Sequence, residues 1–178
     1  MTIKDIMLIS PDSIKAQGDV NYNVDDSKIG AAIRTSQNIY MRDVIGGALL
    51  EKVQTLVYNK MTGLTADTID SEENVAYKTL LDEYIQPLLT YKVAAELCSR
   101  LAYKIRNFGV VKDGSLNINP ADLGEILYVR DNMEVFFNDA CNRIMEFICG
   151  HKEAYPEADV KCGCGESPKY ARGGLFLG

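Results

Sequence analysis

QPLLTYKVAAELCSRLAYKIRNFG, residues 86–109, is the longest stretch of this chain with an uninterrupted helical pattern. Apolar residues recur in it at intervals of three and four, which predicts one broad buried helix face. Pro87 suits a first helical turn, where its missing amide needs no partner, and Gly109 suits a left-handed C-terminal cap. We therefore predict a central helix roughly 30 Å long, which other helices must cover. The apolar positions are Leu89, Val93, Leu97, Leu101, Ile105 and Phe108, flanked by Ala94, Ala95, Cys98 and Ala102.

Five further segments have helical periodicity and recognisable helix ends. Ser10 and Pro11 begin a short helix, Asp26 caps the next one, and Asp70 with Glu73 resembles a capping box. The residue before Pro87 is expected to leave the helical conformation, so a break or kink should precede the central helix. These patterns predict a mainly α fold, a bundle of about five amphipathic helices. The segments are 10–18, 26–46, 48–61, 70–86 and 119–150.

The remaining segments lack a helical period. Residues 62–74 form a long polar loop, a candidate contact loop, and residues 1–9 could extend along a neighbouring chain. Residues 110–118, with a turn at Asp113 and Gly114, fit either a small hairpin or an irregular connection. The chain thus divides into a helical domain, 1–150, and an extended C-terminal arm, 151–178, which is rich in Gly, Pro and charge.

Composition excludes several functional classes. A net charge of −6 and a pI near 4.9 disfavour a protein that coats nucleic acid, because phosphate binding requires a basic surface. No apolar run approaches the roughly 20 residues that span a bilayer, and the first residues are too polar for a secretion signal. Five cysteines, an odd number, favour a reducing compartment and free thiols over a disulfide framework.

Little in the sequence suggests catalysis. The chain has one histidine, His151, and has no glycine-rich phosphate loop, no HExxH motif and no GxSxG motif. The carboxylate pairs lie at predicted helix starts, where negative charge favours the helix dipole. We therefore expect that the protein is not an enzyme and needs no cofactor.

Cys149, His151, Cys162 and Cys164 are the only group with the residue types of a zinc site. Only one residue separates the members of each pair, whereas zinc motifs usually place two or more between paired ligands. The alternative is a core thiol at Cys149 and small residues in a glycine-rich arm. We expect no metal, although the residue types leave the question open.

Three stretches of the chain resemble the head–tail connector proteins of tailed bacteriophages, most closely the neck ring (adaptor) proteins of crAss-like phages. They are ISPDSIKAQGDVNYNVDDSKIGAAIRTSQNIYMRDVIGGALLEKVQ (9–54), ENVAYKTLLDEYIQPLLTYKVAAELCSRLAYKIRNFGVV (73–111) and GGLFLG (173–178). The resemblance implies a mainly helical virion protein, copies of which form a ring beneath the portal vertex, seal the neck and offer the tail a docking surface. It implies no catalytic residues.

The expected partners are further copies of the chain, the portal protein and other neck or tail proteins. Packaged DNA would pass through the ring without sequence-specific binding, and the protein would lie in the virion neck after assembly in the host cytoplasm. The arm from Lys161 onward ends in apolar residues, so we predict Arg172, Leu175, Phe176 and Leu177 as interface anchors. The alternative is a small helical regulatory protein whose cysteine-rich tail senses zinc or redox state.

Overall fold

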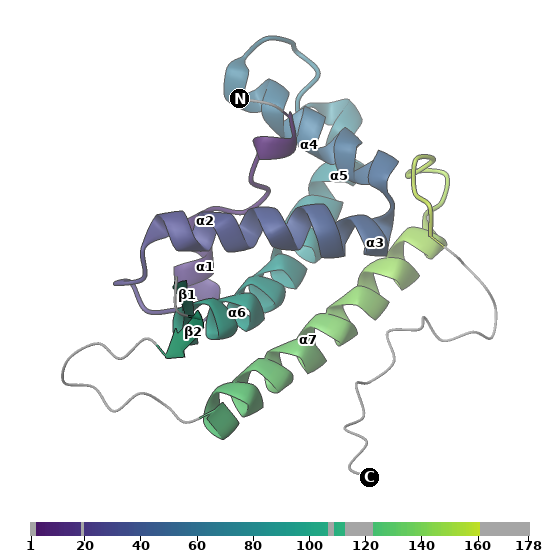
Figure 1. Ribbon diagram of the computed structural model, residues 1–178. Coiled ribbons are helices and arrows are strands. Elements are labelled where there is room, and N and C mark those ends of the chain that lie inside the picture. Colours follow the sequence, from purple (N-terminus) through teal and green to yellow (C-terminus); the bar gives the residue numbers. More distant parts are fainter. Residues whose placement is uncertain (1–2, 19, 107–108, 113–122, 161–178) are drawn as a thin grey trace.

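The computed structural model describes residues 3–18, 20–106, 109–112 and 123–160, which are mainly α-helical (Figure 1). Five helical rods make up this part of the chain, so the predicted mainly α fold is confirmed. A short 3-10 turn, Ile3–Asp5, precedes them. In order, the rods are α1 (Pro11–Gln17); α2 (Asp26–Thr35), a π-helical turn (Ser36–Met41) and α3 (Arg42–Ile45); α4 (Gly47–Thr62); a 3-10 turn (Glu72–Asn74), α5 (Val75–Thr79), a π-helical turn (Leu80–Ile85) and α6 (Gln86–Ala102); and α7 (Leu123–Gly150).

Most predicted helix ends lie where local chemistry placed them. The Ser10 hydroxyl accepts a hydrogen bond from the Ser13 amide at 3.1 Å and caps α1. Asp25, one residue before the predicted cap, accepts from the Ser27 amide at 2.7 Å and caps α2. Gly46 and Gly63 have φ of +86° and +64°, a region that favours glycine, and end α3 and α4.

The predicted break before Pro87 does not occur. Gln86 keeps helical angles, φ −64° and ψ −47°, and the helix runs from Val75 to Ala102 without interruption. The π-helical turn Leu80–Ile85 lies immediately before the proline. A π turn pairs residues five apart and is wider than an α turn, so it accommodates a missing donor and the proline ring. The expected helix stop is therefore wrong.

The central helix ends seven residues earlier than predicted, at Ala102 instead of Gly109. Strands β1 (Tyr103–Arg106) and β2 (Gly109–Lys112) follow and pair antiparallel, with Tyr103 opposite Lys112. Ile105 therefore lies in a strand, and Phe108 lies outside the described residues. The predicted hairpin at 110–118 is displaced, because its first residues pair with the chain before them. The aromatic and β-branched residues of 103–111 favour a strand over a helix.

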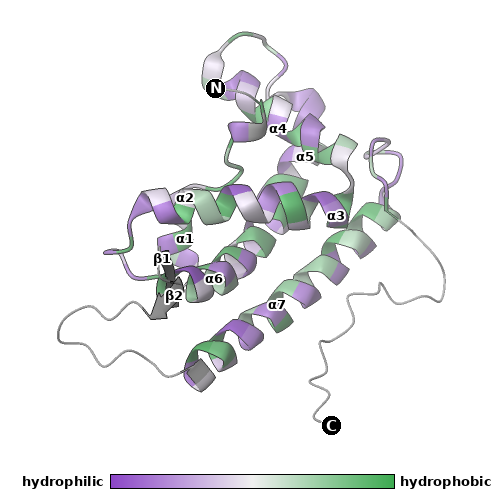
Figure 2. Cartoon of the chain, in the orientation of Figure 1, coloured by the Kyte–Doolittle hydropathy of each residue, from purple (hydrophilic) through white to green (hydrophobic). Residues whose placement is uncertain are grey.

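α6 is the buried centre of the molecule, as predicted, and α7 crosses it in the antiparallel direction (Figure 1). Tyr84, before α6, stacks on Phe147 near the end of α7, with ring centres 4.2 Å apart. Lys92, in the middle of α6, contacts Glu134 in the first half of α7. Figure 2 shows hydrophobic and hydrophilic residues mixed along α2, α6 and α7, as expected of amphipathic helices. Apolar residues of the predicted helical segments that are buried include Ile29, Ile33, Val44, Leu49, Leu50, Val53, Leu56, Leu80, Leu81, Leu89, Val93, Leu97, Phe137, Ala140, Cys141, Ile144 and Ile148.

The N-terminal segment lies along its own helical body. Ile6, Leu8 and Ile9 are buried, and the side-chain amide of Gln37 donates to the Ile6 carbonyl while accepting from the Leu8 amide. Gln86 donates to the Leu8 carbonyl at 3.2 Å. These amide contacts replace the backbone pairing that an extended segment otherwise lacks. The described part of this segment therefore packs on its own chain.

Candidate assembly surface

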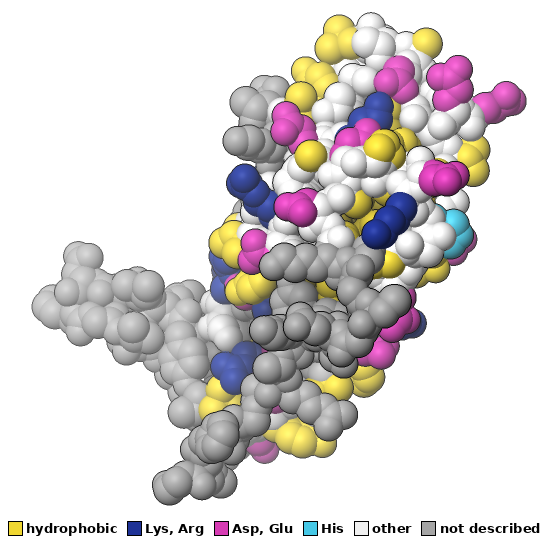
Figure 3. Space-filling model, turned by 90° about the vertical axis from the view of Figure 1, so that its right-hand side faces the viewer, with side chains coloured by type: hydrophobic (Ala, Val, Ile, Leu, Met, Phe, Trp, Pro, Cys, Tyr) yellow, Lys and Arg dark blue, Asp and Glu magenta, His cyan; other side chains and the backbone are white. Residues whose placement is uncertain are grey.

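The first half of α7 has an exposed apolar face. Residues seven apart lie on nearly the same side of a helix, so Tyr128 aligns with Val135 and Val129 with Phe136. The four side chains are 70%, 63%, 45% and 52% exposed, respectively. Viewed in space-filling form, hydrophobic side chains gather at the lower end of the body, at the height where α7 begins (Figure 3). We call these four residues the α7 apolar face.

The α7 apolar face borders the contact between α6 and α7. The Phe136 ring lies against Tyr91 of α6 with ring centres 5.5 Å apart. One turn away, the buried ammonium of Lys92 lies 2.5 Å from the Glu134 carboxylate. The ammonium also lies over the Tyr40 ring, 3.9 Å from its centre. The rigid core of the molecule therefore supports one edge of this face.

Tyr40 extends this contact into a polar chain across three helices. Its hydroxyl donates to Glu96 at 3.1 Å, and Glu96 pairs with Arg100, which donates to Thr35 at 2.9 Å. Burial, followed by the nearby Glu96 charge, raises the pKa of the Tyr40 hydroxyl. Tyr40 lies on the π-helical turn Ser36–Met41, a kind of turn often found at functional sites. Every member has a structural partner, so the chain ties helices together and leaves no group aimed at a ligand.

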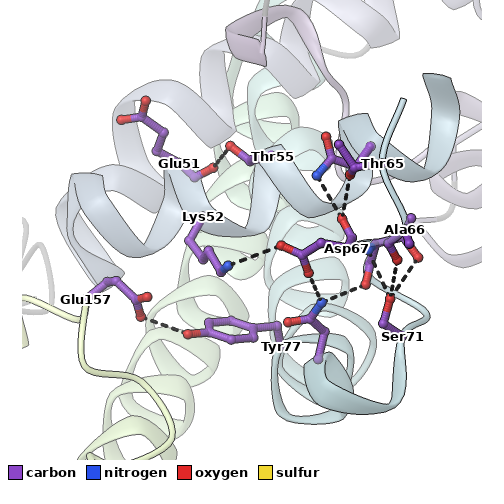
Figure 4. Close-up of polar contacts among 12 residues, drawn as sticks. Glu51, Lys52, Thr55, Thr65, Ala66, Asp67, Ser71, Tyr77 and Glu157 are labelled. Carbon is purple, nitrogen blue, oxygen red and sulfur yellow. Dashed lines mark hydrogen bonds and ion pairs between the residues drawn. The ribbon is translucent and has the colours of Figure 1, made fainter. Parts of the chain in front are cut away.

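The loop at 62–74, a predicted contact loop, is held by its own hydrogen bonds (Figure 4). The buried Asn74 amide donates to the Asp67 carboxylate at 2.6 Å and to the Thr68 carbonyl at 2.8 Å. Ser71 donates to the Ala66 carbonyl at 2.9 Å. Asp70 was predicted to cap a helix but instead pairs with Lys60 and Lys78, 2.7 Å from each. The two lysine contacts lower the pKa of its carboxyl group.

The first ten residues of the predicted arm, 151–160, pack on the helical body. Tyr155 is buried and donates to the Ala76 carbonyl at 2.8 Å. Glu157 accepts a hydrogen bond from Tyr77 at 2.9 Å (Figure 4). Asp159 lies so close to Gly46 that a Cβ at that glycine would be 2.9 Å from the aspartate backbone. These contacts place the start of the arm beside the C-terminal end of α7.

The four predicted anchors, Arg172, Leu175, Phe176 and Leu177, lie outside the described residues. So do Cys162 and Cys164. Of the other two zinc candidates, His151 bonds through Nδ1 to the Phe147 carbonyl oxygen at 2.9 Å. Cys149 is disulfide-bonded. The free-thiol prediction is therefore wrong for Cys149. No group of three or more potential metal ligands occurs within the described ranges.

Sequence reasoning missed the α7 apolar face. It assigned the helix one apolar side, and that side is indeed turned toward α6, with Phe137, Cys141 and Ile144 buried. The sequence does indicate this face, because Tyr128, Val129, Val135 and Phe136 form a second set of apolar residues outside the buried side of the helix. An amphipathic helix with one buried stripe normally carries polar residues there. Met61, which continues the helical period of apolar residues in the predicted helix 48–61, is also exposed.

Fold and surface together define a mainly α-helical protein with an unpartnered apolar helix face and no described helix long and apolar enough to cross a membrane. The chain belongs to a family of unknown function, DUF6712, which matches residues 41–168 and thus includes α7 and its apolar face. Among proteins of curated function and among solved structures, none matches the chain significantly.

Proposed function

We propose that this protein is a non-enzymatic structural subunit of a ring in the neck of a tailed bacteriophage. The ring would connect the portal vertex of the capsid to the tail and help to seal the DNA channel. Its partners would be further copies of this chain, the portal protein and other neck or tail proteins. The protein would reside in the virion and, during assembly, in the host cytoplasm.

The observation that carries this proposal is the α7 apolar face. A patch of two aligned apolar pairs containing two aromatic rings is typical of a surface that another polypeptide covers. Rings require two different patches that meet between successive copies, and the C-terminal arm is a candidate for the second. A net charge of −6 suits a ring through which DNA passes without binding.

The test is to mix the protein with portal rings of its own phage and to image the complexes by negative-stain microscopy. We expect intact protein to add a ring to the portal. Val129→Ser/Phe136→Ser and the 1–160 truncation should fail to add it while keeping their helical circular dichroism. Met61→Ser/Leu64→Ser is the matched control, because it removes two exposed apolar side chains elsewhere. A ring formed equally by all variants would contradict the role of the face, and no ring with intact protein would contradict the neck function.

One observation favours a second candidate, a redox-sensing regulatory protein: the disulfide of Cys149. Under this alternative, reduction would change the structure or the binding of a partner. Zinc content and portal binding should be measured on reduced and oxidised protein purified without chelator. Near-stoichiometric zinc in the reduced form, with no portal binding in either form, would support the alternative. Portal binding without zinc would support the neck subunit.

A further inference from the structure

The α7 apolar face has a candidate occupant within the chain itself. The last six residues, GGLFLG at 173–178, contain Leu175, Phe176 and Leu177 in succession. Three consecutive large apolar side chains at the end of a Gly-rich and charged segment gain stability only when they are covered. Burial of the α7 apolar face against residues 173–178 would therefore remove apolar surface of both from water.

The C-terminal arm is long enough to bring residues 173–178 to the α7 apolar face. Residues 151–160 fix the start of the arm beside the C-terminal end of α7, where Tyr155 lies 5.9 Å from Phe147 between ring centres. From Gly150 back to Phe136 is 14 residues of helix, about 21 Å, and to Tyr128 it is about 33 Å. Counted only from Gly165, after the last cysteine, the 11 residues to Leu175 extend to about 36 Å and, as a Gly-rich coil, average about 18 Å end to end.

Charge favours the same arrangement. Residues 161–178 contain Lys161, Lys169 and Arg172 against one acid, Glu166, which leaves this segment with a net charge of +2. α7 contains five acids and two arginines, which gives a net charge of −3. Asp139 and Glu146 are exposed along the path from the end of α7 to its apolar face. A basic segment that ends in apolar residues therefore runs from an anchor beside an acidic helix.

We propose that residues 173–178 cover the α7 apolar face of their own chain in the free protein, with Leu175, Phe176 and Leu177 packed against Val129, Val135 and Phe136. A tether whose average length matches the span gives an effective concentration near the millimolar range. At micromolar protein concentration the chain's own segment therefore outcompetes that of a second copy. The inference concerns the free chain and does not depend on the neck function.

Covering the face in this way has a consequence for assembly. A partner must displace residues 173–178 before it can pack on α7, so the free protein would resist self-association. The same residues, once released, become available to another surface. Association would therefore depend on a partner that binds the α7 apolar face more tightly than the tethered segment does.

The chain contains no tryptophan, so one substitution creates a specific probe of the face. Phe136→Trp replaces a half-exposed ring by another aromatic ring, and its emission should be compared in the full chain and in the same variant ending at residue 172. We expect the full chain to emit at shorter wavelength and to resist acrylamide quenching. Deletion of 173–178 should abolish both properties. Leu175→Ser/Phe176→Ser/Leu177→Ser in the full chain should act like the deletion, since it keeps length and charge.

Tyr22→Trp is the matched control, because Tyr22 is 73% exposed on the turn between α1 and α2. Its emission should be unaffected by the deletion. Dilution shows whether residues 173–178 of the same chain or of a second copy cover the α7 apolar face. A blue shift that is independent of protein concentration supports the chain's own segment. A blue shift that disappears on dilution identifies a second copy and overturns the proposal. Equal emission with and without 173–178 at every concentration also overturns it.

Hydrogen exchange on the unsubstituted chain gives an independent measurement. Deletion of 173–178 should increase exchange of the α7 amides in the first half of the helix and leave those of α4 unchanged. Equal exchange of α7 in the two forms contradicts the proposal. This readout remains informative if the tryptophan variant fails to fold.

Discussion

Lys92 of α6 places its ammonium 2.5 Å from Oε1 of Glu134 on α7, while its side chain is only 6% exposed. The pair joins α6 to α7 beside the α7 apolar face. A buried charge that loses its partner destabilises the folded state far more than an exposed one. Glu134→Gln should therefore lower the free energy of unfolding by roughly 2–3 kcal/mol in a urea titration.

Two comparisons make this prediction specific. Asp139→Asn removes one partner of the exposed Asp139–Arg143 pair on the same helix and should cost less than about 0.5 kcal/mol. Lys92→Met combined with Glu134→Gln should recover most of the stability lost by Glu134→Gln alone, because no unpaired charge remains buried. Similar losses in all three variants would show that the pair has no special role.

The Tyr77 hydroxyl predicts how stability depends on alkaline pH. Burial, followed by the hydrogen bond to Glu157, raises the pKa of Tyr77 to about 12 from its ordinary value of 10.0. Because the folded-state pKa is the higher one, this contribution is complete below pH 10 and is lost as pH rises toward 12. Over that window the folded state retains the proton that the unfolded state releases, so stability falls by about 1.4 kcal/mol per pH unit from this group.

Tyr77→Phe isolates the effect, because it removes the titrating group and keeps the ring. The difference in free energy of unfolding between the original chain and Tyr77→Phe should shrink between pH 10 and pH 12. Tyrosines and lysines that do not contact Tyr77 titrate equally in both proteins and cancel in the difference. A difference that stays constant over this range would contradict the assignment.

Alanine substitutions at Gly46 and Gly63 test whether the start of the arm, residues 151–160, packs against the helical body. Both have positive φ, but a Cβ at Gly46 would meet Asp159 at 2.9 Å, whereas nothing lies within 4 Å of one at Gly63. Gly63→Ala should lower the free energy of unfolding by about 1 kcal/mol through backbone strain alone. Gly46→Ala should cost about 3 kcal/mol, because strain and a collision with the backbone combine.

Limited proteolysis distinguishes the two substitutions further. In Gly46→Ala, residues 155–160 should become cleavable before the helices, since Asp159 must move to make room. Gly63→Ala should keep the cleavage pattern of the original chain. Equal stability and equal cleavage in the two variants would mean that Asp159 does not contact Gly46 in solution.

Cys98 and Cys141, the free thiols of the described part of the chain, should be nearly inert in the folded protein. Burial raises the pKa of Cys141 to about 12, and burial also raises that of Cys98. Thiol reagents attack the thiolate, of which Cys141 has about one part in ten thousand at pH 8. Labelling with Ellman's reagent under native conditions should therefore be slow at both cysteines and become fast in urea. Rapid labelling of Cys141 without denaturant would indicate frequent opening of the contact between α6 and α7.

Much of the fold is readable in the sequence because the deciding interactions are local. Ser10 accepts from an amide three residues on, and Gly46 and Gly63 adopt backbone angles that other residues avoid. The helical period likewise identifies core positions such as Ile29, Leu49 and Phe137, because each rod buries one stripe. These effects depend on a few neighbouring residues, so they can be predicted without knowledge of the rest of the chain.

The candidate site is less accessible to such reasoning. The apolar run in the C-terminal arm predicts anchors at Leu175, Phe176 and Leu177, whereas Tyr128 and Phe136 look like ordinary apolar residues of a long helix. The position of α6 decides which apolar residues of α7 are buried. The contact between α6 and α7 joins residues about 40 positions apart in the sequence, such as Lys92 and Glu134. The partners of Gln37 are similarly distant in sequence, at Ile6 and Leu8.

By itself, then, the sequence determined the helices, most of their ends and the residues of the core. Tertiary structure alone decided that the helix continues through Pro87, that it ends at Ala102 in a hairpin, and that one face of α7 stays exposed. The physical reason is the range of the interactions involved. Caps and periodicity act over one or two turns, whereas a π-helical turn, a strand pairing or an exposed face depends on the packing of segments far apart in the chain.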